Sequence, residues 1–203
     1  ANNHCCDGGA EGIRTSIEEL DRCGIRHTGV FADSLDYRRN HPLYLTWCGL
    51  RLALVNYTYG TNGMPVPEGM IVNRIDTVRM AADLAAARSG GVDFIVACLH
   101  WGNEYERRAN AAQRSLAAFL RRHGVDVVVG SHPHVVQPWE ADSAHVVLYS
   151  LGNLVSNQRR RYTDGGLVAE VEASRHPEGR MSYALEVTPV WVALPRYRIL
   201  PPE

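Results

Sequence analysis

The amino-acid sequence predicts an α/β fold with a mixed β-sheet. Three apolar runs, at residues 92–99, 125–129 and 146–149, are each interrupted by at most one aspartate and have the composition of strands buried on both faces. Segments with helical spacing of apolar residues separate the strand-like runs in the centre of the chain, which gives the order strand, helix, strand, helix, strand, strand. This alternation is typical of α/β proteins, and 203 residues without a linker fit one domain over residues 1–203.

The N-terminal elements follow from local signals. Apolar side chains recur at helical spacing over residues 13–23, and Gly24 supplies a stop signal, so we expect a helix there. Residues 25–30 then have the composition of a short strand. Two further strand-like runs, residues 43–48 and 50–57, are separated by one glycine and predict a hairpin.

Capping residues mark the central helices. Asp76 is placed to cap a helix that ends at Gly90, and Asn110 is placed to cap the next helix. Near the C-terminus, alternating apolar and polar residues predict strands at 167–172 and 183–192.

Composition excludes several classes of function. Lys+Arg is 21 and Asp+Glu is 22, so the net charge is −1, which argues against nucleic-acid binding because that function needs a strong basic excess. No apolar run approaches the roughly 20 residues of a membrane span, and the chain opens without the features of a signal peptide. We therefore expect membrane contact only through an anchor upstream of Ala1, and the compartment stays open.

The five cysteines form no CxxC pair, which argues against a disulfide framework and against a structural zinc ribbon. Cys48 and Cys98 lie in strand-like runs and are expected to be small core residues. Cys5 and Cys6 follow His4, so a metal role is an alternative for them, but packing beside a loop is the expected role.

Polar side chains follow each buried strand. They are His-Trp-Gly-Asn-Glu at residues 100–104, Gly-Ser-His-Pro-His at residues 130–134 and Leu-Gly-Asn at residues 151–153. In α/β sheets ligands bind at the carboxyl ends of the strands, where several loops converge. We therefore expect these loops to form a site, with Asn3 and His4 as a fourth contribution.

His132 and His134 flank Pro133, which favours an extended backbone on both sides. Two imidazoles at this spacing can converge on one metal ion, and imidazole suits manganese, zinc and iron. His100 is the third candidate in this group. The alternative for the three histidines is a hydrogen-bonded structural turn.

Other polar residues of these loops are candidates for weaker reasons. Glu104 and Glu140 are possible acids or bases, and Gln137 either hydrogen-bonds a substrate or caps the loop. The run Arg159-Arg160-Arg161 either grips an anionic polymer or a phosphate, or forms a solvated basic loop. The candidate substrate contacts are thus Gln137, Glu140, Asn153 and Arg160.

The sequence lacks the motifs that would place carboxylates between two metal ions. Dinuclear hydrolases need anions between their two cations, and the chain has neither an Asp-x-His nor a Gly-Asp-x-x-Asp motif. On its own, the chain offers a histidine-rich half-site.

These residues carry a family resemblance. The matching segments are Ala-Asn-Asn-His at residues 1–4 with Asp-Gly-Gly at 7–9, Leu-His-Trp-Gly-Asn-Glu-Tyr at 99–105, Val-Gly-Ser-His-Pro-His-Val-Val-Gln-Pro at 129–138 with Glu140, and Tyr-Ser-Leu-Gly-Asn at 149–153. In this order they resemble the CapA/PgsA group of bacterial capsule-synthesis proteins, which is associated with poly-γ-glutamate. That group is distantly similar to calcineurin-like metallophosphoesterases.

The resemblance implies a four-layer α/β/β/α sandwich with the motifs at one edge of the sheets. It implies that Asn3, His100, His132 and His134 are metal ligands and that His4 contacts the transition state. Family members carry a Gly-Asp strand motif and an acidic motif before the Asn-Asn-His. Both would precede Ala1, so we expect the domain to lack its first strand and the acidic half of its site.

Two functions remain open, and a third possibility is that this chain has no independent function. In the first, the chain is a CapA-like protein with a metallophosphoesterase-like site, in which a metal-bound hydroxide attacks a phosphoester or acyl centre and His4 or Glu104 assists proton transfer. In the second, it is a non-catalytic polymer-binding or assembly module of a capsule synthesis or export system. Both predict an anionic polymer or phosphoester as ligand and other capsule synthesis subunits as partners, without nucleic acid.

Overall fold

The structure is a computed structural model and describes residues 1–201. These residues form two compact units: an N-terminal unit of residues 1–100 with 123–125, and a C-terminal unit of residues 101–122 with the chain from 126 onward. Within residues 1–201 no helix has the length and apolar character needed to cross a membrane.

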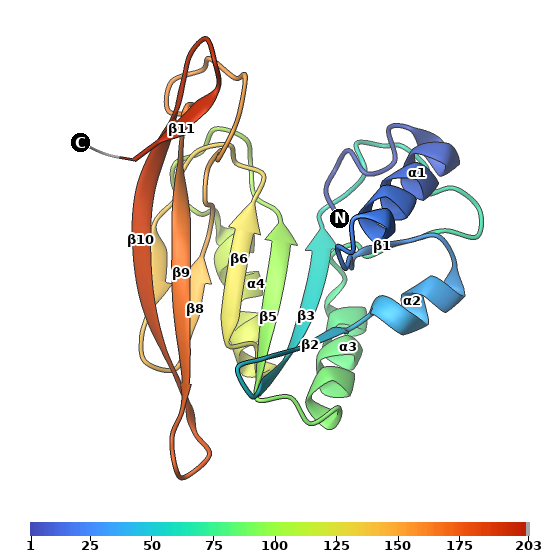
Figure 1. Cartoon of the computed structure of the whole chain (residues 1–203), viewed down its shortest axis with the longest axis vertical. Helices are drawn as coiled ribbons and strands as arrows, with labels where there is room; N and C mark the ends of the chain where they lie inside the picture. The colour runs from blue at the N-terminus through green and yellow to red at the C-terminus, as the bar shows by residue number, and fades with distance from the viewer. Residues whose placement is uncertain (202–203) are drawn as a thin grey trace. The chain divides into compact units, whose positions relative to one another are not determined.

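The N-terminal unit contains three strands of a mixed sheet (Figure 1). β2 (Leu43–Trp47) and β3 (Leu50–Thr58) form the predicted hairpin, and β3 is parallel to β5 (Phe94–His100). The register pairs Thr58 with His100, so the carboxyl ends of β3 and β5 meet. The strands predicted at 43–48, 50–57 and 92–99 are confirmed.

The helices of this unit begin at side-chain caps or at positive-φ glycines. α3 (Thr77–Ser89) begins at Asp76, whose carboxylate accepts from Val78 N at 2.9 Å, and it ends at Gly90, as the sequence predicts. α1 (Gly9–Arg22) is also confirmed. α2 (Ser34–Asn40), capped by the carboxylate of Asp33, was not predicted because it carries no buried residue and therefore no apolar periodicity.

The segment between α1 and α2 differs from the prediction. Only Val30 and Phe31 of this region form a strand, β1, which pairs antiparallel with β4 (Ile71–Val72). The prediction of a strand over residues 25–30 is therefore wrong apart from its last residue. The strand that pairs with β1 lies about forty residues further along the chain, so the local sequence could not define the bounds of β1.

Cys6 is buried in the core, whereas other cysteines are exposed at the surface. Cys6 is buried in a cluster with Ile13, Met70 and Val72, so its expected packing role is confirmed. Burial raises the pKa of the Cys6 thiol to about 11, which keeps it protonated and apolar in character. Cys48 is exposed in the β2–β3 turn with φ 48°, so its prediction as a core residue is wrong.

The C-terminal unit contributes three further strands, which form one parallel and one antiparallel pair. β6 (Val127–Ser131) is parallel to β8 (Val146–Leu148), which pairs antiparallel with β7 (Trp139–Ala141). α4 (Ala111–Arg122) precedes β6 and buries Ala117 and Leu120. The predicted α/β class with a mixed sheet is confirmed.

A three-stranded antiparallel sheet completes this unit. β9 (Gly165–Arg175) and β10 (Met181–Ala193) form the long orange-to-red hairpin of Figure 1, and β11 (Arg198–Leu200) pairs with the end of β10. Both late strands were predicted, and both are longer than their alternating segments.

A reciprocal cap fixes the start of α4. Gln113 N donates to Asn110 Oδ1 at 2.9 Å, and Asn110 N donates to Gln113 Oε1 at 3.0 Å. Asn110 is thus confirmed as a cap. The Gln113 amide is buried and also donates to Gln137 Oε1 at 2.9 Å.

Gly130 in β6 allows a close backbone approach. A Cβ at this position would lie 2.1 Å from Tyr149 O and 2.4 Å from the indole nitrogen of Trp101. That indole donates to Tyr149 O at 2.9 Å, and the two rings stack with centroids 5.9 Å apart. A side chain at residue 130 would therefore separate the elements that carry the loops at 101–105 and 131–134.

A buried polar network holds the N-terminal unit together. His41 Nε2 lies 2.9 Å from Asp83 Oδ2, and Tyr57 donates to the same oxygen at 2.8 Å. Burial by itself raises the pKa of Asp83, but His41, Tyr57 and the Arg79 charge outweigh it and hold this pKa below its ordinary value. The network therefore stabilises the folded unit only while Asp83 is ionised.

We expect Asp83→Asn to destabilise the chain by about 3 kcal/mol at neutral pH, because it leaves buried partners without their charge. Since the folded pKa is depressed, this stabilisation is present above the unfolded pKa of about 4 and is lost as the pH falls through the folded value. Urea unfolding at several pH values tests this: the gap between the wild type and the variant must narrow below about pH 4. Asp21→Asn, on the exposed face of α1, is the matched control, and an equal effect of both variants would contradict the argument.

Candidate functional site

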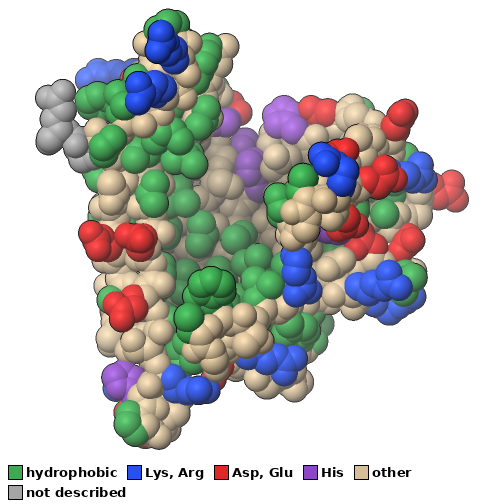
Figure 2. Space-filling model, in the orientation of Figure 1, with side chains coloured by type: hydrophobic (Ala, Val, Ile, Leu, Met, Phe, Trp, Pro, Cys, Tyr) green, Lys and Arg blue, Asp and Glu red, His purple; other side chains and the backbone are tan. Residues whose placement is uncertain are grey.

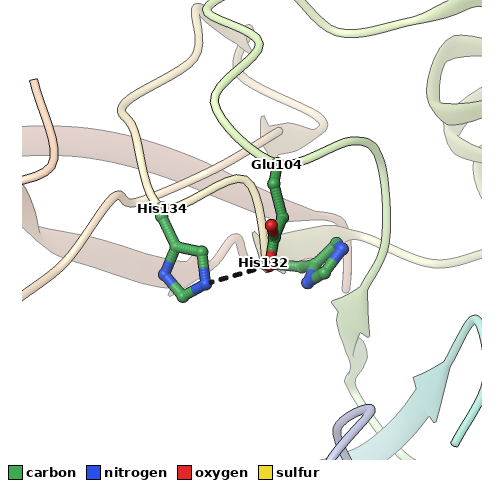
Figure 3. Close-up of side chains that lie close together, drawn as sticks. All are labelled: Glu104, His132 and His134. Atoms are coloured by element: carbon green, nitrogen blue, oxygen red, sulfur yellow. Dashed lines mark ion pairs between the residues drawn. The ribbon is translucent and has the colours of Figure 1, made fainter. Parts of the chain in front are cut away.

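Two loops of the C-terminal unit bring Glu104, His132 and His134 together. One ligand atom from each residue lies within 4.8 Å of the others, and His134 Nε2 is 3.7 Å from Glu104 Oε1. Figure 3 shows the Glu104 carboxylate between the two imidazole rings. The structure therefore places two predicted metal ligands and one predicted acid or base in a single cluster.

The backbone of the second loop aims both histidines at this point. His132 has φ 102° and His134 has φ 60°, both in the left-handed region that non-glycine residues rarely adopt. The expectation of an extended backbone around Pro133 is therefore wrong. Pro133 O accepts from Tyr105 N at 2.7 Å, which ties this loop to the loop of Glu104.

Asn153 fixes the tautomer of His134. Its amide nitrogen donates to Thr163 O at 2.8 Å, so its oxygen must be the atom that faces His134 Nδ1 at 3.0 Å. His134 Nδ1 therefore carries a proton, and in the neutral ring the Nε2 lone pair points toward Glu104. In metal sites the ring nitrogen that does not bind the metal usually donates to an outer acceptor, and Asn153 Oδ1 is such an acceptor here.

The donor set fits a divalent cation. At 3.7 Å, His134 Nε2 and Glu104 Oε1 are too far apart for a hydrogen bond but close to the roughly 3.4 Å between ligands of a tetrahedral zinc ion. His132 is buried, whereas the Glu104 side chain is 44% exposed. Two imidazoles and a carboxylate suit zinc, manganese and iron and do not distinguish between them.

Tyr105 connects the cluster to the arginine run. Its ring stacks on His134 with centroids 6.0 Å apart, and the guanidinium carbon of Arg160 lies 4.1 Å from the centre of the Tyr105 ring. Thr163 donates to Arg160 O at 2.6 Å and accepts from Asn153. The same asparagine thus contacts His134 directly and positions Arg160 through one intermediate residue.

A second constellation lies in the N-terminal unit, where the carboxyl end of β5 meets the start of the chain. His100 Nε2 is 2.8 Å from Asn3 Oδ1, and Asn3 Nδ2 donates to Asn62 Oδ1 at 3.1 Å. Tyr59 stacks on His100 and also donates to Asn62. The structure therefore pairs the predicted ligands Asn3 and His100 and orients the oxygen of Asn3 toward the imidazole.

His4 lies in the same unit with an acidic partner. Its Nδ1 is 2.7 Å from Asp7 Oδ2, and its side chain is 63% exposed. A carboxylate on Nδ1 holds the ring in one orientation and leaves Nε2 at the surface. This is an arrangement suited to proton transfer.

Gln137 and Glu140 are occupied within the C-terminal unit. The buried Gln137 amide donates to Glu106 O at 2.8 Å and to Arg108 O at 3.3 Å, which secures the loop on both sides of Arg107. Glu140 accepts from Tyr149 Oη at 2.8 Å; burial and this contact raise the pKa of Tyr149 to about 12. Both side chains thus hold neighbouring protein groups.

Several partners of the site residues were not identified from the sequence: Tyr59, Asn62, Tyr105, Asp7 as the partner of His4, and Thr163. Asn62 and Tyr105 have left-handed backbones, with φ 52° and 67°, and of these two only Asn62 carries a sequence signal for it. An asparagine before a glycine predicts a turn at residue 62, but it does not predict the residue that the turn contacts.

Residues 1–158 match a protein family described as bacterial capsule synthesis protein PGA_cap. The chain belongs to this family. Among curated PGA_cap-like relatives, the PGA biosynthesis protein CapA of Bacillus subtilis is 28% identical over 201 residues, which cover 94% of this chain and 49% of the relative. The capsule biosynthesis protein CapA of Bacillus anthracis is 28% identical over 174 residues, covering 83% and 42%. The chain thus spans about half the length of the curated relatives it matches.

A solved structure also resembles this PGA_cap chain. A candidate 5′-nucleotidase from Staphylococcus aureus matches with a TM-score of 0.52 at 15% identity, over 80% of this chain and 32% of that one. At this identity the likeness shows the fold alone. It agrees with the α/β class and mixed sheet found in the structure.

We expect Asn153→Ala to change the tautomer of His134, because the acceptor that holds the proton on Nδ1 is lost. Imidazole ¹⁵N shifts measured at alkaline pH without metal should report an Nδ1–H ring in the wild type and a substantial Nε2–H population in the variant. Asn157→Ala is the control, since that side chain contacts Arg159 and Tyr197. Unchanged His134 shifts in Asn153→Ala would refute the assignment.

Proposed function

We propose that this PGA_cap chain contributes a metal-dependent hydrolase site of the metallophosphoesterase type to the synthesis or handling of an anionic surface polymer. The observation that carries the proposal is the convergence of Glu104, His132 and His134, with Asn153 orienting the last of them. The family membership supplies the polymer context. The finer fold that this implies is a four-layer α/β/β/α sandwich, which we propose for the intact domain.

The residues present have distinct proposed roles. His134 offers its Nε2 lone pair, His132 offers a lone pair of one ring nitrogen, and Glu104 offers a negative oxygen, either as ligand or as general base. Asn3 and His100 are proposed as a further ligand pair of the N-terminal unit. When bound, a divalent cation supplies a Lewis acid that polarises a phosphoryl or acyl oxygen.

His4 is proposed as a general acid within the N-terminal unit. Asp7 holds its Nδ1, so the exposed Nε2 is the atom that donates. The candidate substrate contacts are Arg160 and Asn153 at the edge of the cluster. Gln137 and Glu140 act on the substrate through the loops that they secure, and other capsule synthesis subunits are the proposed partners.

A second function is favoured by a specific observation. The arginine run beside Tyr105 is exposed, and it would hold an anionic polymer with or without turnover. A non-catalytic polymer-binding module is therefore the alternative. Turnover discriminates between the two functions.

We expect the chain to bind a divalent cation and to hydrolyse bis(p-nitrophenyl) phosphate in the presence of manganese or zinc. His134→Ala should weaken metal affinity by more than 10-fold and abolish turnover, because it removes a ligand, and Asn153→Ala should weaken it by about 10- to 100-fold. Metal content after dialysis and phosphodiesterase rates are the measurements.

His176→Ala is the matched control, since His176 lies on the β9–β10 hairpin and contacts Ser182. Unchanged metal stoichiometry in His134→Ala would refute the cluster as a metal site. Metal binding without turnover of any phosphoester would favour the module.

A further inference from the structure

A hollow of about 520 Å³ opens beside α1 in the N-terminal unit, and we call it the α1 hollow. α1 packs against β1 (Figure 1), and both elements line this space. Its apolar wall is formed by three side chains of α1, Ile13, Ile17 and Leu20, and by Val30 of β1. Sites for small molecules measure roughly 300–1,000 Å³, so the α1 hollow has the size of such a site.

Two buried polar groups at the wall of the α1 hollow lack hydrogen-bond partners. The side chain of His27 is 9% exposed, and neither of its ring nitrogens makes a hydrogen bond within residues 1–201. The hydroxyl oxygen of Thr28 is buried and equally unpaired among these residues. Both side chains line the α1 hollow. Because buried polar groups in folded proteins are nearly always paired, these atoms indicate a ligand that supplies the missing hydrogen bonds.

Asp36 determines which hydrogen bond His27 can make. Its Oδ1 lies 3.4 Å from His27 Nε2, which is longer than a normal hydrogen bond but close enough to favour the proton on Nε2. In the neutral ring, Nδ1 then carries a lone pair and can only accept. The Thr28 hydroxyl can donate as well as accept. The two groups together therefore match a ligand with one donor and one acceptor, and an amide has both.

The charge of the lining selects a neutral ligand. Within residues 1–201, no acidic or arginine side chain lines the α1 hollow. Figure 2 shows red and blue side chains spread over the visible surface of the N-terminal unit, so charged residues are otherwise common in this unit. A carboxylate or an ammonium group that entered the hollow would lose water without gaining an ion-pair partner. An aliphatic group, by contrast, gains from the apolar wall.

We propose that the α1 hollow binds a neutral aliphatic amide. The amide N–H donates to His27 Nδ1, the amide oxygen accepts from the Thr28 hydroxyl, and the aliphatic group packs against the apolar side chains of α1. The inference goes beyond the proposed function, because the Glu104–His132–His134 cluster contributes no residue to this hollow.

The test uses N-acetyl-leucinamide as the probe, and the half-buried thiol of Cys5, which also lines the α1 hollow, as the reporter. The bound amide should protect Cys5 of the full 203-residue chain from alkylation by N-ethylmaleimide in a saturable manner. Alkylation is followed at each cysteine by tandem mass spectrometry, with a chelator present. The exposed Cys23, which follows α1, should react at an unchanged rate. Since His4 also lines the hollow, this readout is chosen because it does not depend on turnover.

Two further probes test the chemistry of the ligand. N-acetyl-leucine carries a carboxylate in place of the terminal amide, and N-acetyl-glycinamide lacks the aliphatic group. Both should protect Cys5 more weakly than N-acetyl-leucinamide, the first because it introduces a charge and the second because it leaves the apolar wall uncovered. Equal protection by N-acetyl-leucine would overturn the proposal.

A pair of variants tests the assigned contact. Thr28→Val keeps the shape of the side chain and removes the hydroxyl, so it should weaken binding of N-acetyl-leucinamide about tenfold. Ser16→Ala is the matched control in the same hollow, because Ser16 Oγ already donates to Gly12 O at 2.7 Å, and it should leave binding unchanged. Equal loss in the two variants, or the absence of protection by N-acetyl-leucinamide in the wild type, would overturn the proposal and leave the proposed metal-dependent function standing.

Discussion

The side-chain amide of Asn153 is the interaction on which the rest of the C-terminal site depends. Its nitrogen is committed to Thr163 O, and this commitment turns its oxygen toward His134 Nδ1. Because an amide has one donor end and one acceptor end, a single rotamer sets both the tautomer of a histidine and the anchor of the arginine loop. If either hydrogen bond were lost, the amide could flip and exchange its donor and acceptor ends at the remaining contact.

The site residues that could be predicted from the sequence are those that directly follow a buried strand. His100, His132 and Asn153 were identified because each follows a buried apolar run, and the caps Asp76 and Asn110 were identified because their side chains act within three residues. The convergence of Glu104 with the two histidines needed the structure, since it depends on two loops some thirty residues apart. The left-handed backbone at His132 also escaped prediction, because Pro133 favours the opposite conformation and tertiary contacts override it.

The partners of the candidate residues were harder to predict than the residues themselves. Tyr105 and Arg160 are separated by more than fifty positions, and nothing in either local sequence indicates that a ring and a guanidinium meet. Gln137 illustrates the reverse case. A polar residue in a motif loop suggests substrate contact, yet its amide is buried against Gln113 and two backbone carbonyls. A buried polar side chain of this kind contributes to function by holding its loop in position.

The indole of Trp101, packed across Gly130 against Tyr149, gives the protein an internal optical reporter. Of the four tryptophans, Trp101 alone is buried, at 2% exposure, whereas Trp47, Trp139 and Trp191 are 42–76% exposed. We therefore expect its emission to lie at shorter wavelength than that of the other three and to respond to packing three residues before Glu104. Ligand binding near that loop should then change the blue edge of the fluorescence spectrum, with no label attached.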